Sequence, residues 1–148
     1  MKHRGMVPRV WKKEGGERRW VMIELVRCPE CRKGHRALPD FLTPYKHYET
    51  ETIEDVIDEV ITEDDPIDYP CNITMRRWRG WFERNRANVE GQIRSAAYRL
   101  LDLSTEFLKS TGSLLEELRE RISPGWLCTV ERVIYNSGSR IIPYPLLE

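Results

Sequence analysis

The stretch WVMIELVRCPEC, residues 20–31, decides how the N-terminal third of the chain folds. Its first seven residues are almost all apolar, which is typical of a well-buried β-strand. The polar segment 12–18 before it contains two consecutive glycines that suit a tight turn, and residues 7–11 provide a partner strand. The sequence therefore predicts a β-hairpin that runs directly into the Cys28–Cys31 pair.

A CxxC pair at the end of a strand is typical of a zinc knuckle, in which two thiolates point to one ion. Zinc prefers four ligands, and the nearest further candidates are His35, four residues past Cys31, and His3, ahead of the hairpin. We therefore interpret Cys28, Cys31, His35 and His3 as metal ligands, with Zn²⁺ as the cofactor. The alternative is a metal-free knuckle held by the hairpin core. A redox pair fits less well because no βαβ pattern follows.

The rest of the chain shows helical periodicity. Thr52 with Asp55 resembles a capping box, as does Ser113 with Glu116, and Pro124 is expected at the first position of the last helix. Residues 141–148 are expected to be extended. The predicted helices are residues 52–62, 72–85, 88–109, 114–122 and 124–136.

We predict an α+β fold with two parts. A small zinc-ribbon-like β head covers residues 1–48, and an all-helical body of four to five helices covers residues 49–148. The Pro-rich link between the predicted helices 52–62 and 72–85 leaves no room for a further full helix between them.

The net charge of the 148-residue chain is zero, with 24 basic and 24 acidic residues, which alone argues against a generally basic nucleic-acid binder. The charge is strongly segregated, however. Residues 1–47 carry a net charge of +7, residues 48–70 carry −10, residues 71–99 carry +5 and residues 100–148 carry −2.

One face of the predicted helix 72–85 is basic. Arg76, Arg77 and Arg84 lie on it around Gly80, opposite an aromatic stripe that we interpret as core. Guanidinium groups bind phosphate and guanine edges in a forked geometry, so this face is a candidate DNA contact. The alternative is a solvated face, or one paired with the acidic segment 48–70.

Several classes of protein are not supported by the sequence. The longest apolar stretch is too short to span a bilayer, and the first residues have no signal-peptide pattern. We therefore expect a soluble, cytoplasmic protein. Three histidines without a nucleophile triad or a phosphate-binding loop give no basis for an enzyme.

Several segments together resemble a group of uncharacterised bacterial, transposase-related proteins. The shared pattern is CPxC-x3-H-x2-LPDF-x2-PY, which is present from Cys28 to Tyr45, followed by T-x-R-R-W at Thr74–Trp78. This resemblance implies a zinc-ribbon-like head, a helix-turn-helix-like body and DNA binding linked to mobile elements. It also implies that residues 52–85 form the helix-turn-helix-like segment, abbreviated here by the short Pro-rich link between its helices. Members carry a further CxxC just before the position of His3, so the resemblance implies either an incomplete zinc site in this chain or a start upstream of Met1.

We therefore expect a protein that binds double-stranded DNA through the basic helix 72–85. The head would add phosphate contacts through Arg32, Lys33 and Arg36. The alternative is a non-enzymatic interaction module or regulatory factor, which would dock a protein partner or a second copy of the chain.

Overall fold

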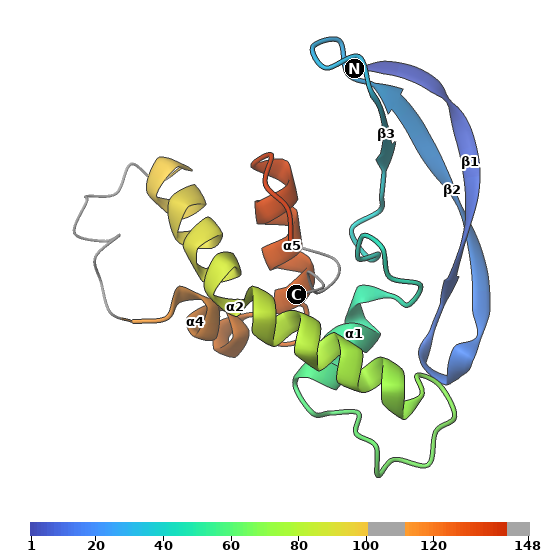
Figure 1. Ribbon diagram of the computed structural model, residues 1–148, viewed down its shortest axis with the longest axis vertical. Coiled ribbons are helices and arrows are strands. Elements are labelled where there is room, and N and C mark those ends of the chain that lie inside the picture. The colour runs from blue at the N-terminus through green and yellow to red at the C-terminus, as the bar shows by residue number, and fades with distance from the viewer. Residues whose placement is uncertain (101–111, 142–148) are drawn as a thin grey trace, which may run out of the picture.

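A long antiparallel hairpin opens the computed structural model, which describes residues 1–100 and 112–141 (Figure 1). Strand β1 covers Lys2–Lys12 and strand β2 covers Arg18–Arg27. A third strand, β3, covers Gly34–Ala37 and pairs with the other edge of β2, so the sheet order is β1-β2-β3. Both predicted strands are confirmed and extended, whereas β3 was not predicted.

The hairpin turn, with the short 3-10 segment η1 at Glu14–Gly16, requires glycine for two reasons. Gly15 and Gly16 have φ angles of 83° and 82°, a left-handed conformation that glycine adopts without a Cβ clash. A Cβ on Gly16 would also lie 2.9 Å from the Tyr69 ring. The backbone N–H of Gly15 donates to the carbonyl of Tyr69 at 2.9 Å. The turn therefore rests directly on the loop that carries Tyr69.

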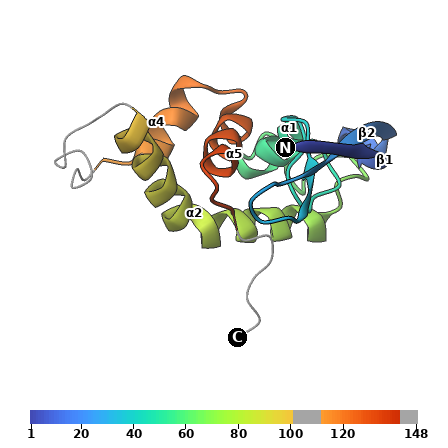
Figure 2. The same cartoon turned by 90° about the horizontal axis from the view of Figure 1, so that it is seen from above.

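Four helices follow the sheet in the described part of the chain. Their bounds are α1 Thr50–Ile57, α2 Asn72–Leu100, α4 Leu114–Arg121 and α5 Trp126–Asn136. The other three helices pack along one side of α2, and the hairpin stands beside them (Figure 2). This arrangement confirms the predicted α+β fold, a small β head followed by a helical body. No described helix has both the length and the apolar character needed to cross a bilayer.

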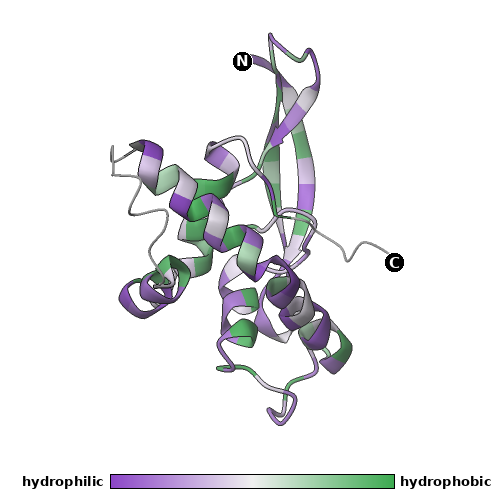
Figure 3. Cartoon of the chain, turned by 60° about the vertical axis from the view of Figure 1, so that its left-hand side comes forward, coloured by the Kyte–Doolittle hydropathy of each residue, from purple (hydrophilic) through white to green (hydrophobic). Residues whose placement is uncertain are grey.

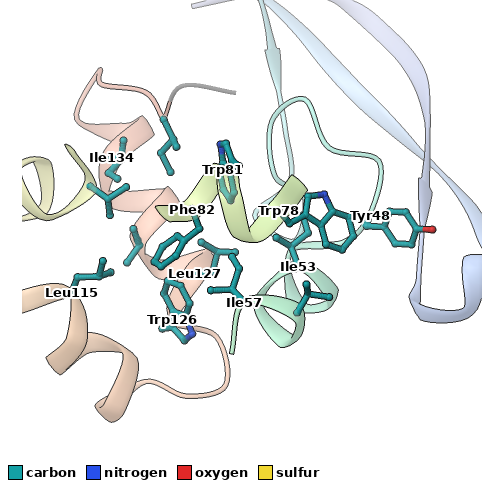
Figure 4. Packing of buried hydrophobic residues seen from close by; sticks show 14 of the residues in the cluster. Tyr48, Ile53, Ile57, Trp78, Trp81, Phe82, Leu115, Trp126, Leu127 and Ile134 are labelled. Carbon is teal, nitrogen blue, oxygen red and sulfur yellow. The ribbon is translucent and has the colours of Figure 1, made fainter. Parts of the chain in front are cut away.

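Aromatic side chains of α2 form the centre of the helical core. Trp78, Trp81 and Phe82 are all buried, and they face α1 and α5 (Figure 4). The Phe82 ring lies 5.3 Å from the fully buried Trp126 ring, in an edge-on arrangement that favours contact between aromatic quadrupoles. Apolar residues gather where the helices meet (Figure 3). The interpretation of the aromatic stripe as core is confirmed.

The helix α2 is continuous, so the predicted break after Asn85 is wrong. The buried Asn85 side chain donates from Nδ2 to the carbonyl of Trp81, one turn earlier, at 2.8 Å. Its polarity is therefore satisfied within the helix and does not end it. Residues 101–109 of the second predicted segment lie outside the described part of the chain, as do residues 142–148 of the expected extended tail.

Of the two predicted capping boxes, the one at α1 is not formed and the one at α4 is. The helix α1 begins at Thr50 with Glu49 as its N-cap, so the predicted capping role of Thr52 is wrong. The Thr52 hydroxyl donates instead to the Glu49 carboxylate at 3.4 Å. At α4 the prediction is confirmed, because the Ser113 side chain accepts the backbone N–H of Glu116 at 3.2 Å.

A carboxylate from another helix sets the start of α5. This helix begins at Trp126 with Gly125 as N-cap, so the prediction that Pro124 starts it is wrong. The buried Glu54 of α1 accepts the backbone N–H groups of Gly125 at 2.7 Å and Leu127 at 2.8 Å. Glu54 satisfies donors that a glycine N-cap has no side chain to reach.

The helix α4 is capped in the same way. Glu90 of α2 accepts the N–H groups of Leu114 at 2.7 Å and Leu115 at 2.8 Å, together with the Ser113 hydroxyl at 3.1 Å. Burial alone would raise the pKa of Glu90, but these bonds and the one from Arg94 lower it below its ordinary value. Two of the described helices thus start on carboxylates supplied by other helices.

A buried acidic side chain also faces the core from α5. Glu131 is buried, and its Oε1 atom has no hydrogen-bond partner among the described residues. Burial raises the pKa of Glu131 to about 8, against smaller opposing effects of the Thr43 hydroxyl and the charge of Lys46. Glu131 is therefore protonated at neutral pH.

Replacing Glu54 with glutamine tests the cap of α5. The amide accepts hydrogen bonds at only one of its two polar atoms, so one buried N–H of α5 loses its partner. We expect E54Q to lower the free energy of unfolding by about 2 kcal/mol in urea titrations. E51Q, on the exposed side of the same helix, is the control and should match the wild type. Equal stability of E54Q and E51Q would contradict the capping role.

The stability of an E131Q variant should depend on pH differently from that of the wild type. The folded chain holds the Glu131 proton up to about pH 8, whereas the unfolded chain releases it near 4.5. Folded-state stability therefore falls as pH rises through that window. The neutral E131Q removes this loss, so its Tm relative to the wild type should increase from pH 5 to pH 8. Parallel Tm profiles would contradict the protonation of Glu131.

Candidate metal site and basic groove

The turn after β2 brings three metal-ligand side chains together at the far end of the sheet from the hairpin turn (Figure 1). The ligand atoms of Cys28, Cys31 and His35 all lie within 4.8 Å of one another. Backbone bonds fix the turn: the N–H of Arg32 donates to the carbonyl of Cys28 at 3.0 Å. The N–H of Cys28 in turn donates to the carbonyl of Lys33 at 3.1 Å.

The electrostatics of this cluster favour a bound cation. Backbone N–H groups of Cys31 and Glu30 donate toward Cys28 and lower its pKa, which favours the thiolate that metals bind. Cys31 Sγ lies 3.3 Å from His35 Nε2, close to the about 3.6 Å between sulfur and nitrogen ligands around tetrahedral zinc. Cys31 and His35 are exposed, so a fourth position is open to solvent. The group is therefore able to hold a metal ion.

The strand β3 explains why His35 joins the cluster and His3 lies outside it. Val26 pairs with His3 on one side and with His35 on the other, so the two histidines stand two strands apart. That separation is about 10 Å between their backbones. The Nδ1 atom of His3 instead lies 2.8 Å from Oε1 of Glu24.

The predicted basic residues of α2 lie on its exposed side. Arg76, Arg77 and Arg84 are exposed along the first half of the helix. A Cβ on Gly80 would lie 3.3 Å from the guanidinium of Arg84, so this side chain lies across the glycine. Neither Arg77 nor Arg84 forms an ion pair with any described residue.

The acidic segment 48–70 does not cover these two arginines. Glu63 pairs with Arg79 at 2.5 Å, and Asp58 binds side chains of α4 and α5. The hydrogen bond from Arg79, with a smaller effect of the Arg76 charge, lowers the pKa of Glu63. Arg76 therefore lies within the electrostatic field of Glu63.

A groove of about 520 Å³ lies between the first half of α2 and the loops beside it. Its lining contains cations and aromatic rings and no carboxylate. The basic lining residues are Lys12, Lys46, His47, Arg77 and Arg84, and the aromatic ones are Tyr45, Tyr48, Tyr69, Trp78 and Trp81. Sequence reasoning found only the arginines as functional candidates. No local signal connects the other residues, because they come from separate segments that only the tertiary fold brings together.

The basic residues predicted for the head lie at the other end of the sheet. Arg32, Lys33 and Arg36 are exposed beside the metal cluster and form no ion pair with the described residues. The hairpin turn, by contrast, rests next to the start of α2. At about 3.3 Å per residue, the length of β2 places Arg32 and Lys33 roughly 30 Å from the hairpin turn. Arg36, on β3, lies nearer and shares a cavity with the groove residues Tyr45 and His47.

Comparison with known proteins gives one match. No curated protein and no solved structure matches the chain. The model of a domain of unknown function, DUF6431, matches residues 1–78, which include the sheet, the metal cluster, α1 and the first turns of α2. Because this match covers more than half of the chain, the protein belongs to the DUF6431 family.

Proposed function

We propose that the protein binds duplex DNA, with the exposed arginines of α2 and the basic residues beside the metal cluster on the phosphate backbone. The observation that carries this proposal is that Arg77 and Arg84 form no ion pair with the described residues, in a chain whose net charge is zero. Cations without ion-pair partners leave a local positive surface that attracts phosphate.

The spacing of the two basic sets supports the same proposal. Arg32 and Lys33 lie roughly 30 Å from the hairpin turn that rests beside α2, close to the 34–36 Å of one turn of B-DNA. A duplex laid along the hairpin would therefore present phosphates of successive turns on one side to both sets. The association with mobile elements, as a transposase-related protein, rests on the resemblance carried by Cys28–Tyr45.

We also propose that the metal ion is Zn²⁺. Two thiolates and an imidazole are the donors that zinc prefers, and a knuckle at the end of an otherwise exposed sheet needs the cross-link for rigidity. Zinc would hold β3 against the turn and so fix Arg32, Lys33 and Arg36.

Elemental analysis of the purified protein should find about one zinc per chain. We expect C28S and H35A to lose it, because each removes one of three clustered ligands. C71S is the matched control, since Cys71 lies beside α2 and outside the cluster. Loss of zinc in H3A would show that His3 moves to complete the site. Absence of metal from the wild type would contradict the zinc proposal.

Salt dependence should measure the phosphate contacts of α2. Each contact that is removed reduces the slope of log K against log salt by about one. We therefore expect R77A and R84A each to weaken duplex binding and flatten this slope, as measured by fluorescence anisotropy from low to moderate salt.

R121A is the control, because Arg121 is an exposed arginine at the end of α4. An effect of R121A equal to that of R77A would contradict a specific role for α2. Failure of the wild type to bind duplex at low salt would overturn the proposal. It would leave the interaction-module alternative, for which the exposed Trp20 and Met22 on the outer face of the hairpin provide an apolar contact surface.

A further inference from the structure

We propose that the groove beside α2 holds an unpaired nucleotide of a nucleic-acid strand, with its base against tyrosine rings and its phosphate on the arginines. This inference rests on the proposed nucleic-acid binding and names the form of nucleic acid that the groove takes. The groove residues are those of the 520 Å³ cavity described above.

The aromatic side of the groove is available to a base. Tyr45 is 66% exposed and Tyr69 is 50% exposed, although both line a cavity. Tyr45 also has a φ of 63°, in the left-handed region that costs a non-glycine residue energy and that is enriched at functional sites. An exposed ring at the edge of a basic groove is the platform on which single-stranded bases stack.

Two lysines of the groove lie over aromatic rings that also line it. The Nζ atom of Lys12 lies 5.6 Å from the ring centre of Tyr48 and 5.9 Å from that of Tyr69. The Nζ atom of Lys46 lies 4.8 Å from the ring centre of Trp81. The buried Tyr48 and Trp81 rings thus hold two ammonium groups in the wall of the groove that the exposed Tyr45 and Tyr69 also line, so one bound unit would meet both kinds of contact.

The arginines complete the site along α2. Arg77 and Arg84 are seven residues apart, about two helical turns, so both point from nearly the same side of the helix into the groove. The lining holds no carboxylate to compete with a phosphate or to attract a cation. An anionic ligand with a flat ring therefore fits the groove better than a neutral or cationic one.

Duplex DNA uses only part of this arrangement. Its bases are stacked inside the helix, so a duplex contacts the arginines through phosphates and leaves the tyrosines unused. An unpaired nucleotide, at a strand end, in a bulge or in a single strand, exposes a base face. The volume of the cavity lies within the range of sites that enclose one small ligand.

Cys71 provides an internal reporter of occupancy. It lines the groove and is exposed, and hydrogen bonds from the Thr74 hydroxyl and backbone N–H lower its pKa. Cys128, on α5, lies outside this groove, and burial raises its pKa. Cys71 should therefore be alkylated by iodoacetamide faster than Cys128 at neutral pH, and a ligand in the groove should slow the reaction at Cys71 alone.

The test measures binding of the zinc-loaded full chain to a labelled twelve-nucleotide oligothymidine and to a duplex of the same length. We expect the single strand to protect Cys71, and Y45A and Y69A each to weaken single-strand binding about tenfold, the usual effect of removing one stacked base. Duplex affinity should change less than twofold. W20A, which removes an exposed ring of the hairpin outside the groove, is the matched control. Circular dichroism and Tm confirm that each variant folds.

The outcomes separate the two proposals. Duplex binding that depends on Arg77, with no effect of Y45A on either ligand, would overturn the groove inference and keep the proposed DNA binding. Absence of binding to either oligonucleotide would overturn both. If thymidine monophosphate alone binds as tightly as the oligonucleotide, the groove takes a free nucleotide and the strand inference is overturned.

Discussion

The buried carboxylate of Glu54 is the contact on which the helical body depends. It joins α1 to the start of α5, and Asp58, one turn later on α1, binds the Trp126 indole N–H of α5 and Arg119 of α4. A charge buried in a core is costly, and burial raises the pKa of Glu54, while the backbone N–H groups of Gly125 and Leu127 offset part of that cost. Glu54 and Asp58, two carboxylates of the acidic segment 48–70, are therefore structural and are directed into the helical body.

This use of the acidic residues determines the surface of the protein. Glu63 forms an ion pair with Arg79, the arginine of α2 that faces the acidic segment. Arg77 and Arg84 form no such pair with the described residues. A chain with no net charge thus keeps a local positive region, because Glu54, Asp58 and Glu63 of the acidic segment form contacts elsewhere in the fold. The zero total says nothing about where the charge lies.

The features that the sequence predicts well are those that a short window encodes. The apolar strand 20–26, the glycine turn and the aromatic stripe of α2 follow from local periodicity and backbone preference. The metal cluster can be predicted in part from the sequence, because two of its ligands, Cys28 and Cys31, are close in sequence. The features that local patterns miss depend on tertiary contacts. The start of α5 is capped by Glu54, which belongs to another helix, and does not lie at Pro124. Asn85 is a polar residue of the kind found at helix ends, but its side chain donates a hydrogen bond within its own helix.

The alternation of side chains along the paired strands β1 and β2 restricts how the length of the hairpin can vary. It places the metal cluster at one end and, through Gly16 on Tyr69, the edge of the basic groove at the other. Side chains alternate between the two faces of a strand, so inserting one residue into each strand would turn every later pair to the opposite face. Outside the bulge between His3 and Gly5, insertions or deletions of two residues per strand preserve the faces, and each shifts the cluster by about 7 Å. In the regularly paired part of the hairpin, the distance between its two ends therefore changes in steps.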